Sequence, residues 1–156
     1  MSEPTLRSTR LFTLTLQVDP NLVDVGETPY GRRRIATVTG GTFAGDELRG
    51  TVLPAPAGDW LLLRRDGILQ LDVRLTLKTD DGHLIYMSYR GMRHGPAWVM
   101  EQLNMGVKVD PSQYYFRATP WFETASEKYR FLNRIVCVST GRRDPTGPVY
   151  EVFQIL

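Results

Sequence analysis

The chain is poor in the residues that most metal, thiol and phosphate sites require. It has one cysteine, Cys137, and two histidines, His83 and His94. A single cysteine cannot form an internal disulfide, and neither histidine stands in a recognisable metal-ligand spacing. No segment matches a glycine-rich phosphate loop, a dinucleotide fingerprint or a nucleophile elbow. We therefore expect no metal and no cofactor, which leaves the chemistry of carboxylates, phenols and guanidinium groups.

Long apolar runs and a strong charge of one sign are also absent. No stretch approaches the roughly 20 apolar residues that a membrane-spanning helix needs, and the polar segment after Met1 does not resemble a signal peptide. These features predict a cytoplasmic protein with no membrane contact. The net charge is only +2, and acids separate the arginine clusters at 32–34, 64–65 and 142–143. Nucleic-acid binders concentrate their charge in one stripe, so we expect no such partner.

What the chain does have is alternation of apolar and polar residues with period two, which is typical of β-strands. A length of 156 residues with 42% apolar content suits one globular domain, residues 1–156. Tight hairpin turns are predicted at Asp66-Gly67 and Asp81-Gly82, because glycine takes positive φ without strain. A helix is expected over 96–105, between Pro96 and Gly106. Residues 19–31 are expected to form a loop, and the last two strands to span 132–140 and 148–156.

Nine or ten strands with one short helix must protect their edges, and closure of the sheet does so most simply. The predicted fold class is therefore all-β, a single antiparallel β-barrel with one short helix. A β-sandwich is the alternative. The barrel is favoured because successive hairpins produce the up-and-down strand order that closes directly.

The predicted strand 69–78 raises the question of function, because it carries Asp72 and Arg74 on its polar face. Two interpretations are open. Either the apolar face fills the barrel and the charged face meets water, or a partner subunit covers the apolar face and the charged face lines the lumen. The segments YYFRATPWFET and HLIYMSYRG place arginine, aromatic and acidic residues together in the same way. Under the second interpretation, Arg74 and Arg117 would bind a ligand anion in an enclosed chamber.

Four motifs in order, TGGTFAGDELRGTVLPAPAGDW, DGILQLDVRLTLKTDDGHLIYMSYRG, YYFRATPWFET and YRFLNRIVCVSTGRR, resemble the domain-of-unknown-function family 3237 from about residue 8 to the end. The resemblance implies a barrel of the calycin type, similar to allene oxide cyclase and dirigent proteins, that assembles as a homo-oligomer. It also implies, for a few members, cofactor-independent chemistry on aromatic acids such as decarboxylation. The segment PAPAGDW and Leu75 depart from the family pattern, which weakens any transfer of substrate identity.

These observations together lead to a hypothesis of function. We expect a barrel that binds a small, partly apolar anion and acts as a metal-free lyase or isomerase on an aromatic or unsaturated carboxylic acid. The alternatives are a non-catalytic, lipocalin-like carrier or sensor, and a structural protein with a filled barrel. The candidate catalytic residues are Glu123, Asp72, Tyr86 and Tyr115. The candidate ligand-binding residues are Arg74, Arg117, Trp60, Tyr89, Asn133 and Trp98.

Overall fold

The computed structural model describes residues 2–156, which form ten strands, one α-helix and two short 3-10 helices. The strands are β1 (Ser8–Val18), β2 (Val23–Thr28), β3 (Gly31–Ala44), β4 (Arg49–Val52), β5 (Gly58–Leu63), β6 (Leu69–Thr79), β7 (Leu84–His94), β8 (Tyr115–Glu123), β9 (Cys137–Asp144) and β10 (Gly147–Ile155). The helices are α1 (Ala97–Asn104), η1 (Pro111–Gln113) and η2 (Arg130–Arg134). The predicted all-β class with one short helix is thus confirmed.

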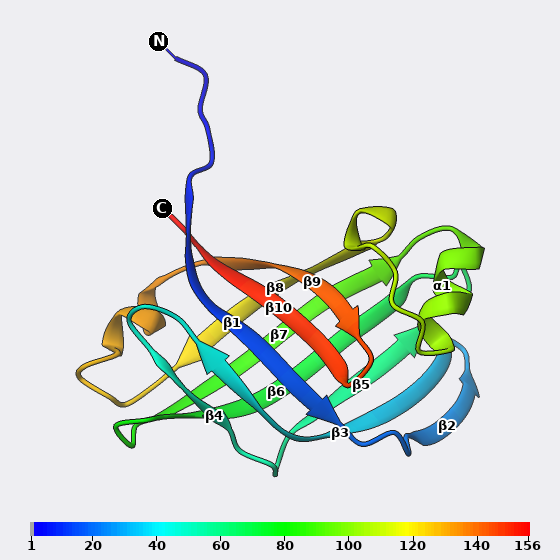
Figure 1. The fold of residues 1–156 in the computed structure, drawn as a ribbon, viewed down its shortest axis with the longest axis horizontal. Coiled ribbons are helices and arrows are strands. Elements are labelled where there is room, and N and C mark those ends of the chain that lie inside the picture. The colour runs from blue at the N-terminus through cyan, green and yellow to red at the C-terminus, as the bar shows by residue number, and fades with distance from the viewer. Residues whose placement is uncertain (1) are drawn as a thin grey trace.

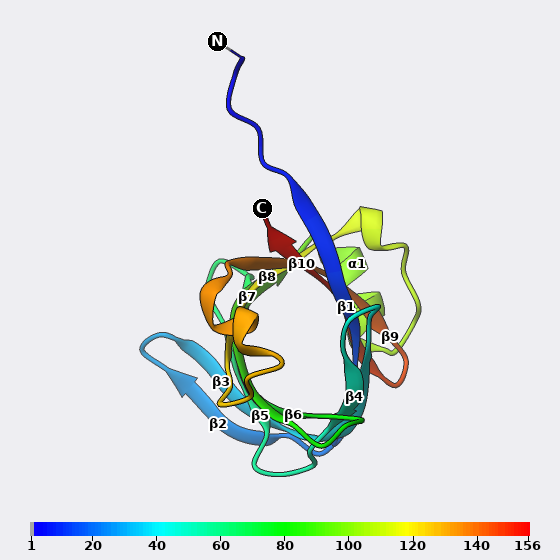
Figure 2. The same ribbon diagram turned by 90° about the vertical axis from the view of Figure 1, so that its left-hand side faces the viewer.

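The sheet closes on itself as an antiparallel barrel of eight strand positions (Figures 1 and 2). The order runs β1-β10-β9-β8-β7-β6, and then β4 and β5 together occupy the position between β6 and β3. Pairing of β3 with β1 completes the circle, while β2 extends from β3 outside it. The barrel prediction is therefore correct, and the sandwich alternative is not.

Hairpin turns connect the consecutive strands where the sequence predicts them. Gly67 and Gly82 have φ angles of +86° and +91°, the conformation that glycine adopts without strain. The second turn joins β6 to β7, which pair continuously from Leu69↔Arg93 to Lys78↔Leu84. These local signals set the register, and the register decides which side chains face inward.

Three local predictions need correction. The expected loop 19–31 contains β2, whose residues pair with β3. The strand expected to begin at Leu132 begins at Cys137, because residues 130–134 form the 3-10 helix η2. The helix lies where it was expected and buries Val99 and Leu103, but Trp98, a candidate ligand-binding residue, is 53% exposed and does not line the interior of the barrel.

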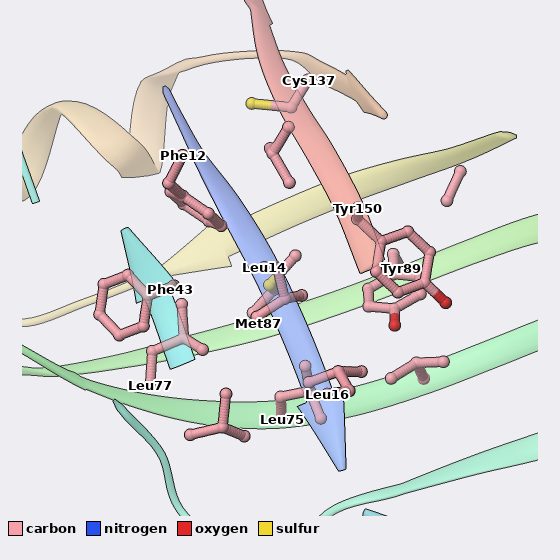
Figure 3. Close-up of a cluster of buried hydrophobic side chains, with 14 of the residues drawn as sticks. Phe12, Leu14, Leu16, Phe43, Leu75, Leu77, Met87, Tyr89, Cys137 and Tyr150 are labelled. Atoms are coloured by element: carbon pink, nitrogen blue, oxygen red, sulfur yellow. The ribbon is translucent and has the colours of Figure 1, made fainter. Parts of the chain in front are cut away.

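Aromatic and aliphatic side chains fill one end of the barrel. Phe12 packs edge-on against Phe43 and Phe122, with ring centroids 5.5 and 5.8 Å apart. Leu77 and Ile85 are completely buried beside them. Figure 3 shows Phe12, Phe43 and Leu77 on one side of this core, with Tyr89 and Tyr150 farther along the barrel. Within residues 2–156, no helix is long and apolar enough to cross a membrane.

Candidate functional site

The other end of the barrel, next to α1, is hollow. It contains a cavity of about 240 Å³ that Leu103 and Asn104 of α1 help to line. The apolar part of its wall comes from inward-facing residues of β1, β3, β5, β6 and β8. Its remaining polar side chains are Arg34, Asp59, Tyr89, Arg93, Arg143 and Tyr150. Because they come from five different strands, only closure of the barrel brings them together.

Asp59 supplies the only carboxylate of the cavity wall. It is the second residue of β5, and its side chain lies on the lumen side with that of Leu61, two residues on. Burial raises the pKa of Asp59 to about 7, although the Asp72 N–H and the positive charge of Arg93 oppose the rise. The Asp72 N–H donates to the Asp59 Oδ1 at 3.0 Å, which fixes the orientation of the carboxyl group. Near neutral pH this group therefore exists in both protonation states, as a proton-transfer catalyst requires.

Two tyrosines stand together in the wall of the cavity. The rings of Tyr89 on β7 and Tyr150 on β10 meet edge to face with centroids 5.0 Å apart, and each residue is only 2% exposed. Figure 3 shows the two hydroxyl oxygens close to each other. Desolvation raises the pKa of both phenols, so both remain protonated donors. Apart from Tyr150, the Tyr89 hydroxyl has no hydrogen-bond partner within the described chain.

Arginines make the cavity electropositive. Arg93, near the end of β7, lies over the ring of Phe116 at 5.7 Å, and its buried Nε has no partner among residues 2–156. Desolvation and the nearby charge of Arg143 lower the pKa of Arg93, which means that two like charges face one interior space. The backbone N–H of Arg143 donates to the Tyr114 hydroxyl at 2.9 Å, which ties this part of β9 to the start of β8. An anion placed between these guanidinium groups would relieve their repulsion and satisfy the buried donor.

The geometry does not support the enclosed chamber expected around Arg74 and Arg117. Both arginines are exposed on the outer surface, where Arg74 lies 5.7 Å from the ring of Trp60 and Arg117 lies 5.3 Å from the ring of Tyr115. The apolar residues of β6 face the lumen instead and are buried there. Of the two interpretations of that strand, the lumen interpretation of its charged face is therefore wrong.

The other candidate residues are also mostly outside. Asp72 is partly buried and borders outer grooves, while Tyr86, Tyr115 and Glu123 are exposed on the same outer surface. The side-chain amide of Asn133 donates to the Thr124 carbonyl at 2.9 Å and its oxygen accepts from the Thr124 N–H at 2.8 Å, a contact that holds a loop together. Tyr89 alone among the candidates belongs to the cavity. The structure thus brings several of these residues together, but on the outer surface of the barrel.

The sequence contained a signal for the residues that were missed. Asp59 and Arg93, like the candidate residue Tyr89, interrupt strand faces that are otherwise apolar, and a polar group on a core face requires a partner or a role. Tyr89 and Arg93 share the parity of Met87, a core residue of β7. No sequence pattern brings β5, β7, β9 and β10 together at one end of a barrel, however. That proximity comes from closure.

Among residues 2–156 no group of three or more histidine, cysteine, aspartate or glutamate side chains is arranged to hold a metal ion. The cavity residues offer one carboxylate, two phenols and three guanidinium groups. This donor set suits an organic anion and the transfer of protons to or from it.

The fold and the cavity define a closed antiparallel β-barrel whose lumen is packed at one end and hollow at the other. The chain belongs to the family described as "Protein of unknown function (DUF3237)", whose model matches residues 6–155. A relative from Bradyrhizobium diazoefficiens, UPF0311 protein blr7842, is 36% identical over 98% of this chain and 99% of its own.

Solved structures agree with this assignment. The protein of unknown function RPA1785 from Rhodopseudomonas palustris superposes with a TM-score of 0.94 at 33% identity, covering 99% of this chain and 100% of the other. A "beta-barrel like protein" from Acinetobacter baumannii has a TM-score of 0.85 at 36% identity over 99% of each chain. An enzyme from Penicillium herquei shares the fold, with a TM-score of 0.74 at 23% identity over 100% of this chain and 99% of that one. The resemblance expected from the sequence motifs is confirmed.

Proposed function

We propose that the hollow end of the barrel binds a small organic acid and catalyses proton transfer on it, as an isomerase or lyase does. The observation that carries this proposal is the meeting, inside one cavity, of the Asp59 carboxyl group, whose pKa is raised to about 7, with Arg93 and Arg143, neither of which forms an ion pair within the described chain. A carrier has no need of an acid with a pKa of about 7, because it only has to hold its ligand. The distant likeness to an enzyme supports the fold alone.

The ligand is inferred from charge and size. Arg34, Arg93 and Arg143 outnumber the single acid Asp59, so the site attracts an anion. A volume of about 240 Å³ corresponds to the liquid volume of about eight water molecules, which accommodates a small monocyclic or short unsaturated acid. The rings of Phe116, Tyr89 and Tyr150 provide an aromatic wall for its apolar part.

The proposed chemistry assigns a role to each group. Arg93 and Arg143 bind the carboxylate of the ligand. Ionised Asp59 takes a proton from a carbon next to a carbonyl group, and the electron pair moves onto the carbonyl oxygen. The Tyr89 and Tyr150 hydroxyls donate hydrogen bonds to that oxygen as its negative charge develops. Protonated Asp59 then returns the proton, either to the same carbon or to a conjugated one.

Two probes test the proposal, phenylpyruvate for proton transfer and cinnamate for binding. In D₂O, the wild-type protein should accelerate exchange of the benzylic hydrogen of phenylpyruvate, as followed by NMR. Asp59→Asn should reduce this rate by at least about a hundredfold, since general acid-base catalysis contributes on the order of 10²–10⁴. Asp80→Asn, on the exposed β6–β7 turn, should leave the rate unchanged.

Binding of cinnamate, measured by calorimetry, should weaken at least about tenfold in Arg93→Gln, because a hydrogen bond between charged groups contributes roughly 1.5–3 kcal/mol. Arg65→Gln is the matched control, since Arg65 is an exposed arginine in the turn before β6. Exchange that persists in Asp59→Asn, or binding that is indifferent to Arg93, would contradict the assigned roles. Binding without any exchange would favour the carrier alternative.

A further inference from the structure

The outer surface of β6, β7 and β8 has the composition of a protein interface. These strands lie side by side (Figure 1) and expose Trp121 at 59%, Tyr115 at 48% and Met92 at 41%. Arginines stand between these apolar residues, and no lysine lines either of the two grooves on this surface. Tryptophan, tyrosine, methionine and arginine are enriched in interfaces, whereas lysine is depleted. A surface of this kind is expected to be covered by another molecule.

The charges on this surface are not compensated within the described chain. Arg117 forms no ion pair there; it donates to the Phe116 carbonyl at 2.8 Å and lies over the ring of Tyr115. Glu123 and Asp72 likewise have no ion-pair partner among residues 2–156. The surface therefore presents free charges of both signs, a pattern that a second copy of the same surface can neutralise.

The order of outward residues along β8 is self-complementary under a two-fold axis. Arg117, Thr119, Trp121 and Glu123 alternate on the exposed side of this strand. Consider a two-fold axis that lies parallel to the sheet surface, at right angles to β8, and passes over Pro120. Rotation about this axis exchanges position 117 with 123 and position 119 with 121. When two copies meet face to face about this axis, the guanidinium of Arg117 lies opposite the carboxylate of Glu123 in the other copy, and this contact occurs twice.

The shape of the surface agrees with its charge pattern. A groove of about 700 Å³ lies on the Arg117 side of the axis, with Thr119, Arg90 and Met92 in its wall, while Trp121 projects on the other side. The register places Arg90 beside Thr119 and Met92 beside Arg117, so the groove runs across neighbouring strands. If a surface has a projection on one side of a two-fold axis and a hollow at the same distance on the other side, the projection of each copy faces the hollow of the other. Trp121 of each copy thus enters the groove of the other.

The available area corresponds to a small interface between two copies. The nine residues of β8 span about 30 Å, and the three strands β6, β7 and β8 span about 14 Å, from the standard strand rise and spacing. Their product, on the order of 400 Å² for each copy, is about half of the roughly 800 Å² that each partner buries in a standard interface, so the contact belongs to the weak class. We propose that the protein forms an isologous homodimer through the outer surface of β6–β8, with Arg117–Glu123 pairs around a two-fold axis at Pro120.

Charge reversal tests both the dimer and its geometry. Wild-type protein should sediment as a dimer at concentrations on the order of 100 μM, and Arg117→Glu or Glu123→Arg should each raise the dimer Kd at least about a hundredfold, because each opposes like charges twice. The double variant R117E/E123R restores opposite charges at both contacts and should dimerise again. So should an equimolar mixture of the two single variants, as heterodimers.

Arg65→Glu and Glu101→Arg are the matched controls, because both residues are exposed and neither lines the two grooves of this surface. Circular dichroism verifies that every variant is folded. A wild-type protein that stays monomeric overturns the proposal. So does a dimer that resists the single reversals, or a failure of the double variant to recover; these outcomes would assign the surface to another partner or the dimer to another face. None of them bears on the lumen site, which the exchange assay measures separately.

Discussion

Replacing Asp59 by Asn should make the protein more stable at alkaline pH, in proportion to the burial of that carboxyl group. The pKa rises from 3.8 to about 7 on folding because burial disfavours the ionised form. A pKa that is raised in the folded state contributes stability at low pH that is lost as the pH climbs towards the folded value. At 1.36 kcal/mol per pK unit, a shift of about three units amounts to about 4 kcal/mol. This free energy disappears between about pH 4 and pH 7.

The assay is urea unfolding of the wild type and of Asp59→Asn at pH 4 and pH 8.5, monitored by circular dichroism. At pH 4 both side chains are neutral, so their free energies of unfolding should differ by less than about 1 kcal/mol. At pH 8.5 the variant should be more stable by up to about 4 kcal/mol, because asparagine has no charge to bury while its carbonyl still accepts from the Asp72 N–H. Comparison of the two proteins cancels the other titrating groups. The reasoning would be refuted if the difference in free energy of unfolding between the two proteins did not change with pH, or if the wild type were more stable than Asp59→Asn at pH 8.5.

Three further outcomes are expected. Leu77→Ala, at the packed end, should lower the free energy of unfolding by about 2–5 kcal/mol in a urea titration, whereas Leu61→Ala beside the cavity should cost less; equal costs would contradict the division of the barrel. Cys137 is buried, and burial raises the pKa of its thiol to about 11. A thiol reagent should therefore label it only as the protein unfolds. Rapid labelling of the native protein would show instead that the thiol is accessible. Gly41→Ala should lower the melting temperature much more than Gly67→Ala. Gly41 combines a φ of +149° with a Cβ position 2.2 Å from the Thr15 carbonyl oxygen, whereas Gly67 has positive φ and open space; equal melting temperatures would count against this account.

The elements of the fold could be predicted because their signals are local. Alternation along residues 69–78 and glycines at 67 and 82 establish strands and turns without reference to the rest of the chain. The strand β2 was missed because an isolated stretch of six residues with Gly26 in its middle has the composition of a loop. Its pairing with β3 is a tertiary interaction that local propensity does not contain.

The candidate site was misplaced for a different physical reason. Charged residues on β6 and β8 attract attention in the sequence, but sequence parity states only that they share a face, not which side of the barrel that face becomes. The cost of desolvation decides the matter, since a lumen lined by β6 buries leucine far more favourably than arginine. The groups that do enter the lumen, Asp59 and Arg93, are fewer and each stands alone on an apolar face. They could be recognised as a site only after closure brought their strands together.

A barrel filled with side chains at one end and hollow at the other should not open uniformly. Strands β6, β7 and β10 run through both parts. One end of each strand is therefore packed in the core, and the other end borders the cavity. Amide hydrogens near Leu77 and Ile85 should exchange only on global unfolding, whereas those near Leu69 and Arg93 should exchange through smaller fluctuations. A ligand bound in the cavity would fill the space that side chains fill at the packed end. Its binding free energy would then slow the exchange of amide hydrogens at the cavity end of the same strands.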